Sequence, residues 1–406
     1  MMRRLIFLSL LLLACASAFP VLGQTPFALS NIGQPAESRD ARMVGRGGWG
    51  MAVQDSLNPG FTNLASLTDL RHVAVRFTVH GEKGSHKDSH GSRTTHRTMI
   101  PDVRVGLPVI KGRLALSAGM EVLRSFEYRT QEPKTWYAWD DTLSGYEQFL
   151  REGTLWRVPF GVSWQPVESI SLGASLGLVQ GALREELFNY FREPSDSSGN
   201  PLYLTTGRTQ EDTFSGTMAT LAMRLGSADG PMLGVSYTPG YDLDAERKLS
   251  VGGLVARSYD TYTLSMPEKW EAGFQLPVRG RWHLGADARY QPFSRFSGYA
   301  DWEADMVDEY VVSLGLEREL AFARHGGGNN RPLRVGLRVM RWGYQMNGAD
   351  IMEKTISVGT GFPFRRKMGM LDVALSYSRL GDEAKNGLQS DIWRLTVSVA
   401  GLERWW

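Results

Sequence analysis

The sequence predicts an all-β protein, a transmembrane antiparallel β-barrel of about fourteen strands. Three observations predict this class. Apolar and polar residues alternate in segments along most of the 406 residues, and an export signal precedes these segments. The connections between segments are alternately long and short. The net charge does not indicate a class of partner. The 45 basic and 43 acidic side chains nearly cancel, so there is no strong electrostatic field that would attract nucleic acid or an acidic partner.

The alternation starts near residue 72. Val73, Val75 and Phe77 fall on one face and polar residues on the other, since successive strand side chains point to opposite sides. Other segments with this pattern include residues 113–122, 156–164, 170–178, 333–340 and 393–399. Their polar faces are rich in Gly, Ser, Ala and Arg, which suits a crowded wet lumen. Aromatic residues at segment ends, such as Trp282 and Tyr290, match a membrane-interface girdle.

Connection lengths give a sharper test, because outer-membrane barrels have short periplasmic turns and longer external loops. The odd connections are long, at residues 81–98, 129–146, 189–207, 244–262 and 295–308. The even connections are mostly short, at residues 109–112, 166–168, 227–230 and 277–280. The exceptions are a longer even connection at 321–331 and shorter late outer loops at 344–353 and 381–390. A soluble sandwich has no reason to sort its loops in this way.

The N-terminus has the three regions of a secretory signal: two arginines, an apolar run over residues 5–13, and small residues up to Ala18. Cleavage after Ala18 or Gly23 satisfies the small-residue preference, and Gly23 gives the more usual length. A rival interpretation makes Cys15 the lipidated first residue of a lipoprotein. Cys15 is the only cysteine, so ordinary cleavage leaves no disulfide framework. Past the signal, no stretch approaches the ~18 apolar residues of a spanning helix, so membrane insertion requires a barrel.

An irregular, glycine-rich segment lies between the signal and the first strand. Its pattern includes Gly45, Gly47, Gly48, Asp55, Asn58 and Pro59. Later stretches read PMLGVSYTPGYDLD, MPEKWEAGFQLP and GMLDVALSYSRLGDE. With the strand pattern, these features resemble the outer-membrane long-chain fatty acid transporter (FadL-type) family. Gly60, after the Asn-Pro pair, and Arg404, near the C-terminal aromatics, depart from the family's pattern.

The N-terminal pattern predicts a signal peptide over residues 1–23, and the resemblance implies a plug (hatch) over residues 24–69 inside the lumen of a barrel over residues 70–406. The composition agrees, because glycines let backbone approach the wall closely and adopt positive φ. Charged plug residues are expected to pair with lumen charges; they are Arg39, Asp40, Arg42, Arg46 and Asp55. The turn at residues 58–60 is expected to start a short helix over residues 61–70. A flexible linker is the alternative, but linkers seldom hold several large apolar residues.

Seven arginines are predicted by alternation to face the lumen, as candidates for ligand binding or plug pairing. They are Arg76, Arg104, Arg113, Arg289, Arg334, Arg338 and Arg394. A lipid-facing arginine near the bilayer midplane costs ~2–4 kcal/mol, so the face of each strand that carries the arginine is expected to face the lumen. One or more of them can bind a fatty acid carboxylate through two hydrogen bonds. The alternative is pairing with plug or wall carboxylates such as Glu121, Asp287 and Asp372.

The chain lacks HExxH, a phosphate loop and a cysteine pair, and we expect neither an enzyme nor a cofactor. Four of the 7 histidines lie in residues 80–96, a predicted external loop. His86 and His90, with Asp88 between them, suit a divalent metal only on a helix, and the neighbouring glycines favour a flexible coil. We therefore expect no metal site.

These features predict outer-membrane transport of hydrophobic compounds, such as long-chain fatty acids, through a plugged barrel. A polar pore serves such solutes poorly, because it offers them no gain over water. The resemblance implies instead an external apolar site, followed by plug rearrangement or a sideways wall opening. The outer-loop candidates for that first site are Trp136, Tyr137, Trp139, Phe188, Tyr190 and Phe191.

Two alternatives stay open: a FadL-like scaffold for protein secretion or surface attachment, which requires a protein partner, and a general porin. The expected location is the outer membrane of a Gram-negative-type bacterium. The expected partners are the lipid bilayer, a hydrophobic small-molecule ligand and the barrel-assembly machinery during biogenesis. No nucleic acid is expected.

Overall fold

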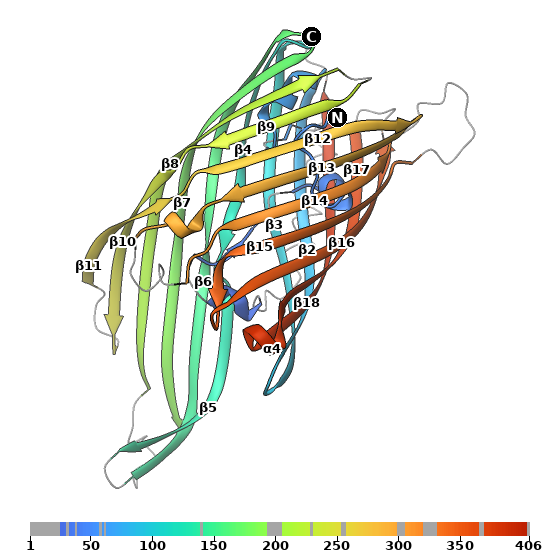
Figure 1. Cartoon of the computed structure of the whole chain (residues 1–406). Helices are drawn as coiled ribbons and strands as arrows, with labels where there is room; N and C mark the ends of the chain where they lie inside the picture. Colours follow the sequence, from blue (N-terminus) through green and yellow to red (C-terminus); the bar gives the residue numbers. More distant parts are fainter. Residues whose placement is uncertain are drawn as a thin grey trace.

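Long antiparallel strands surround a lumen that holds the N-terminal segment (Figure 1). The structure is a computed structural model and describes residues 25–29, 32–36, 39–56, 59–60, 62–138, 141–192, 205–227, 230–252, 257–298, 305–319, 331–364 and 369–403. The predicted signal peptide, Asn58 and Trp139 lie outside the described residues.

Strands and short helices have the following bounds. The strands are β1 (Gln34–Pro35), β2 (Val73–Asp88), β3 (Gly91–Ile110), β4 (Leu114–Ser125), β5 (Tyr128–Ala138), β6 (Asp141–Val167), β7 (Ile170–Arg192), β8 (Thr206–Gly226), β9 (Met232–Thr238), β10 (Tyr241–Val251), β11 (Arg257–Met266), β12 (Lys269–Arg279), β13 (Trp282–Gln291), β14 (Glu309–Arg318), β15 (Leu333–Met346), β16 (Ala349–Phe364), β17 (Gly369–Asp382) and β18 (Leu388–Glu403). The helices are η1 (Pro26–Leu29), α2 (Ala41–Gly45), η2 (Leu64–Asp69), η3 (Phe293–Arg295) and α4 (Glu383–Asn386).

Fourteen strands make the wall. The wall strands carry the labels β2 to β18, but three of the fourteen strands bend and carry two labels each. These are β4 with β5, β9 with β10, and β11 with β12. The ring closes where β18 pairs with β2, from Glu403 opposite Val73 to Leu388 opposite Asp88. The predicted class, a transmembrane antiparallel barrel of about fourteen strands with an N-terminal plug, is confirmed.

Alternation decides which side chains face lipid. Along β14, Val311 and Ser313 are buried on the lumen side, whereas Val312 and Leu314 on the outer side are 53% and 46% exposed. Exposed apolar side chains of this kind form the lipid-facing band of a membrane barrel. Among the described residues, no helix is long and apolar enough to cross a membrane.

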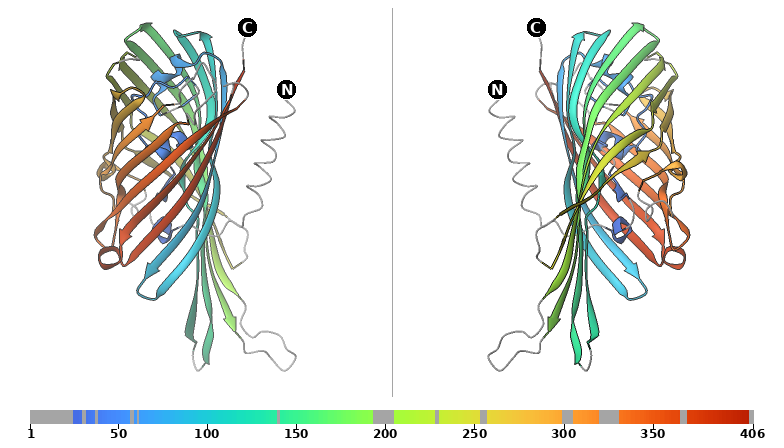
Figure 2. Two further views of the ribbon diagram at one scale, coloured as in Figure 1. Left: turned by 90° about the vertical axis from the view of Figure 1, so that its right-hand side faces the viewer. Right: turned by 90° about the vertical axis from the view of Figure 1, so that its left-hand side faces the viewer.

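The outer connections differ from the sequence prediction. The sequence predicts a loop over residues 81–98, but β2 and β3 continue to a tight turn at Ser89 and His90. Likewise β5 and β6 pair across most of the loop predicted over residues 129–146. Together with β7 they project beyond the rest of the barrel (Figure 2). Beyond the membrane both faces of a hairpin contact water, so the alternation that marks a membrane strand is absent there. The opposite end, with short turns, is the periplasmic end.

The N-terminal segment runs along the lumen from the outer end to the periplasmic end. Thr25 hydrogen-bonds Ser390 near the outer end of β18 (2.8 Å). Further along, β1 pairs with β4, α2 contacts β15 to β18, and η2 contacts β6 and β7. Residue 61, where the sequence predicts the helix to begin, lies outside the described residues. The observed η2 begins after Asn63, because the Asn63 side chain accepts a hydrogen bond from the Ala65 N–H (2.9 Å).

An apolar core lies in the outer half of the lumen. Phe27 of η1 contacts Trp342 edge-on, with ring centroids 6.1 Å apart, and Trp342 contacts Tyr344 at 5.7 Å. The Tyr344 hydroxyl donates to the Phe27 carbonyl (2.6 Å). All three rings are fully buried. Burying an apolar side chain of this size contributes roughly 1.5–3 kcal/mol, so this core holds the start of the plug in place.

Candidate functional site

Glu317 on β14 is the centre of one cluster between plug and wall. Its carboxylate accepts hydrogen bonds from Arg42 Nε (3.0 Å) and Arg46 Nη1 (2.7 Å) of the plug, and from Arg334 Nε of β15 (2.9 Å). Arg42 also pairs with Asp55 (2.7 Å). The side chains of Arg46 and Glu317 are only 2% and 3% exposed. Breaking a buried ion pair by removing one partner is strongly destabilising, so this cluster fastens the plug.

A second chain of charges connects the plug to β2, β3 and β4. Arg76 binds Asp40, the residue that caps α2, and also Asp102 (2.9 Å). Arg104 then links Asp102 (2.8 Å) to Glu121 (3.3 Å). These five side chains are buried, so each charge in this row must be compensated by the opposite charge of its neighbour.

Glycines bring the plug backbone directly against the wall. Gly47 and Gly48 adopt positive φ, at 77° and 93°. A Cβ added to Gly336 of β15 would lie 2.0 Å from the Gly47 nitrogen, so only glycine fits there. On the wall, the Asp287 carboxylate accepts hydrogen bonds from the N–H groups of Gly50 (2.7 Å) and the next residue, Met51 (2.9 Å).

The wall splits between β3 and β4 on the outer side. The two strands pair only as far as Asp102 opposite Glu121, and beyond this point β1 of the plug takes the free edge of β4. Gln34 lies opposite Ser125 in this pairing. Side chains also cross the split, since Arg97 Nη2 donates to Ser125 Oγ (2.9 Å). The plug therefore forms part of the wall at this place.

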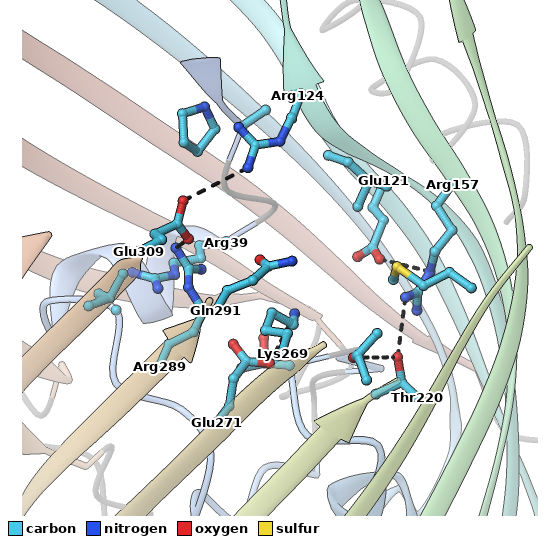
Figure 3. Close-up of a pocket in the computed structure, with 18 of the residues that line it drawn as sticks. Arg39, Glu121, Arg124, Arg157, Thr220, Lys269, Glu271, Arg289, Gln291 and Glu309 are labelled. Atoms are coloured by element: carbon cyan, nitrogen blue, oxygen red, sulfur yellow. Dashed lines mark hydrogen bonds and ion pairs between the residues drawn. The ribbon is translucent and has the colours of Figure 1, made fainter. Parts of the chain in front are cut away.

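A cavity of about 180 Å³ lies between plug and wall beside this split (Figure 3). On one side Glu309 pairs with Arg289 (3.1 Å) and faces Arg124 (3.9 Å), and on the other Arg157 pairs with Glu121 (3.1 Å). The apolar part of the lining includes Leu123, Leu155, Met218, Met266 and Val311. A cavity lined by both charged and apolar side chains can accept an amphipathic molecule.

The family model named BamG matches residues 1–406. The chain belongs to the BamG family. No curated protein of similar sequence was found.

The fold of this BamG-family chain is shared by the solved structures of two toluene transporters and a FadL homologue. The Pseudomonas putida toluene transporter TodX has a TM-score of 0.59 and 15% identity, with 91% of this chain and 100% of that chain covered. A Pseudomonas aeruginosa FadL homologue has a TM-score of 0.58 and 12% identity, with coverage of 89% and 98%. The Ralstonia pickettii toluene transporter TbuX has a TM-score of 0.58 and 14% identity, with coverage of 90% and 99%. At these identities the likeness shows the fold, and it confirms the FadL-type resemblance at that level.

The BamG-family barrel directs six of the seven predicted arginines into the lumen. They are Arg76, Arg104, Arg289, Arg334, Arg338 and Arg394, each within ion-pair distance of a carboxylate. Arg113 does not face the lumen, because it is an exposed residue of the turn before Leu114. The sequence analysis includes Arg113 in the alternating strand of residues 113–122, but the side chain of a turn residue does not follow the alternation of a strand.

The outer aromatics of the BamG-family chain lie on the projecting parts of β5, β6 and β7 (Figure 2). Trp136 contacts Phe191 edge-on (5.0 Å between centroids), and Tyr190 stacks on Tyr146 of the neighbouring strand (4.7 Å). The predicted candidate Phe188 contacts the same Tyr190 ring (6.2 Å), whereas Tyr137 is 83% exposed. Aromatic contacts of this kind stabilise a sheet, so several of the predicted ligand-binding side chains contact one another.

Sequence reasoning missed Glu317, Asp69 and Arg224. The Asp69 carboxylate accepts a hydrogen bond from Arg224 Nη2 (2.7 Å) at the periplasmic end of the plug. The side chains of Arg224 in β8 and Glu317 in β14 both lie on the side of the strand that faces the lumen. The alternation that identified the other arginines would have found both.

His86 of the β2–β3 hairpin lies outside the membrane-spanning part. Its Nδ1 is 2.7 Å from Ser390 Oγ and its Nε2 is 2.7 Å from Thr95 Oγ1. Burial, and secondly the positive charge of Arg93, lower its pKa from 6.5 to about 4. His90 is exposed at the turn. Within the described ranges, no group of three His, Cys, Asp or Glu side chains is placed to hold a metal ion.

We expect the outer end of the lumen to loosen as the pH falls from 6.5 towards about 4. Unfolded His86 takes up a proton near pH 6.5 while the folded form stays neutral, so the folded hairpin loses up to roughly 3 kcal/mol over this window. Hydrogen exchange of residues 84–96 across this range measures the effect. The His86→Asn variant should lack the dependence, and an unchanged dependence in that variant contradicts the assignment to His86.

Proposed function

We propose that the protein is a plugged outer-membrane channel for hydrophobic compounds. The observation that supports this function is the position of β1, which takes the edge of β4 that β3 leaves free. The lumen cavity lies beside it, lined by Pro35 and Ala36 of the plug and by Leu123 of β4. Release of β1 would therefore open a path between the cavity and the bilayer. The fold shared with toluene transporters agrees with this class of solute, and long-chain fatty acids are our proposed example.

A reversible lock tests this route. Gln34 lies opposite Ser125, and the chain's only native cysteine is Cys15 in the predicted signal, so the double variant Gln34→Cys, Ser125→Cys introduces one new disulfide. Proteoliposomes are assayed for uptake of a labelled long-chain fatty acid, toluene and a small sugar, each against protein-free vesicles. We expect uptake of the hydrophobic compounds without the sugar, loss of uptake on oxidation and recovery on reduction. The single-cysteine variants are the controls.

The outcomes separate the route from the function. Uptake that survives the closed disulfide contradicts passage through the split but leaves transport standing. An absence of uptake in the unlocked protein contradicts transport. Leakage of the sugar would favour an open porin.

We propose, as a second candidate function, a scaffold that binds protein partners in connection with barrel assembly. The family's name, BamG, hints at this link. The structure favours it in one respect, because ion pairs and an apolar core fix the plug along the lumen and make the barrel a rigid body. Purification from the native outer membrane in mild detergent tests it. A stoichiometric outer-membrane protein in the preparation supports the scaffold, whereas a preparation of this chain with lipid alone contradicts it.

A further inference from the structure

Basic side chains gather on the outer face of three neighbouring wall strands. On each of β15, β16 and β17 the outward-facing apolar run ends, toward the outer end of the barrel, at a cation. These cations are Arg341, Lys354 and Arg379. In the other half of the ring, the corresponding positions of β8 and β10 hold Thr217 and Asp242. At this level the two halves of the wall therefore differ in charge.

Aromatic side chains fix the level of these cations in the membrane. The Arg341 guanidinium lies over the ring of Tyr310, 5.2 Å from its centroid. On β17 and β18, Tyr377 contacts Trp393, with ring centroids 5.0 Å apart. Arg379 donates to the hydroxyl of the same Tyr377 (3.3 Å). Tyrosine and tryptophan gather where the hydrocarbon meets the headgroups, so the cations lie at the level of the outer-leaflet headgroups.

Like charges lie next to one another in this cluster. Lys354 is directly opposite Arg379 in the register of β16 and β17, and both side chains are exposed. Such a pair destabilises a sheet unless an anion compensates it. Arg379 pairs with Asp391 (3.0 Å) and Arg341 with Asp350 (3.2 Å). Among the described residues, no carboxylate lies within ion-pair distance of Lys354, so one positive charge is left for an anion from outside.

Apolar side chains continue the same surface into the membrane. Ile356 and Val358 follow Lys354 along β16 and are 53% and 46% exposed, and Leu375 of β17 lies opposite Val358 and is 43% exposed. A molecule that joins an anionic group to hydrocarbon chains satisfies both parts of this surface, whereas a free anion satisfies only the first. Guanidinium groups bind phosphate through two parallel hydrogen bonds, and lysine binds it as a point charge.

We propose that Lys354, Arg379 and Arg341 bind the phosphate group of an outer-leaflet lipid, whose acyl chains lie along β16 and β17. Lys354 supplies the uncompensated charge, and the two arginines supply directed hydrogen bonds. The site lies on the outer wall and uses no part of the lumen or of a protein partner. The proposal therefore goes beyond both candidate functions and depends on neither.

Native mass spectrometry of the full chain, after detergent exchange to remove native lipid, tests the site. The probe is lipid A that carries its phosphates, compared with the same lipid after enzymatic removal of the phosphates and with inorganic phosphate alone. We expect Lys354→Gln to weaken binding of the phosphorylated lipid about tenfold, because a charge-assisted hydrogen bond is lost. Lys354→Arg keeps the charge and should bind as the wild type does.

The matched control is Lys248→Gln on β10. Lys248 is also an exposed, outward-facing lysine, but it belongs to the other half of the ring and pairs with Glu246 (3.6 Å). This variant should bind the lipid as tightly as the wild type. The shift of each variant on heating in gel electrophoresis shows that its barrel is folded.

Each contrary result overturns a stated part of the proposal. Equal binding by wild type and Lys354→Gln, or equal weakening by Lys248→Gln, overturns the site. Equal binding of the lipid with and without its phosphates overturns the phosphate contact. If inorganic phosphate displaces the lipid when the two are present in equal amounts, the cations hold a free anion and the assignment to a lipid fails.

Discussion

Replacing Glu317 by Gln is expected to detach the plug and to destabilise the barrel by about 3–5 kcal/mol. The neutral amide cannot compensate Arg42, Arg46 and Arg334, whose guanidinium groups all bind this one carboxylate in a buried place. Unfolding in detergent micelles measures the loss of stability. Planar-bilayer recordings measure the plug, and we expect steady ion conductance from the variant where the wild type stays closed.

The matched control is Glu383→Gln at the outer surface. Glu383 also accepts from a cation, Lys87 (2.7 Å), but these side chains are 37% and 63% exposed. An exposed pair contributes at most about 1 kcal/mol, so this variant should keep both stability and closure. If Glu317→Gln behaves like Glu383→Gln, the cluster does not fasten the plug.

Replacing Gly336 by Val is expected to displace the plug without removing a charge. The new Cβ would lie 2.0 Å from the Gly47 nitrogen and 2.1 Å from the Arg46 carbonyl carbon, both backbone atoms that cannot rotate away. Overpacking of this kind costs about 1–3 kcal/mol or more, while valine itself suits a strand. We expect conductance to rise and protease to gain access to the plug.

Gly81→Val is the control for this second change. Gly81 is also a glycine of a wall strand, but a Cβ there meets nothing within 4 Å. Its barrel should fold and stay closed. A closed Gly336→Val barrel would show that the plug can shift along the wall without opening a path.

The sequence could predict which side chains of a strand face the lumen and which face lipid. Alternation identified Arg76, Arg104 and Arg334 as lumen residues, because each strand carries this information locally. It failed at Arg113, which belongs to a turn, and for the outer hairpins, where no lipid face imposes a pattern. A residue's position on a strand therefore predicts the side of the wall and little more.

Pairing partners could not be predicted in this way. Arg46 and Glu317 are 271 residues apart, and only the ring of intervening strands brings them together. The split beside β4 was equally hidden, because a strand edge that pairs with the plug has the same sequence pattern as one that pairs with a neighbour.

The course of the plug along the lumen constrains the order in which the chain is assembled. The ring is joined by β18 and β2, at opposite ends of the barrel sequence, and the same β18 supplies Ser390, which binds Thr25 at the beginning of the plug. A finished ring could not easily admit this length of ion-paired backbone. We infer that the strands gather around the N-terminal segment and that the seam is the last contact to form. Such distant closure is intrinsically slow, which gives the open ring a long life as an intermediate.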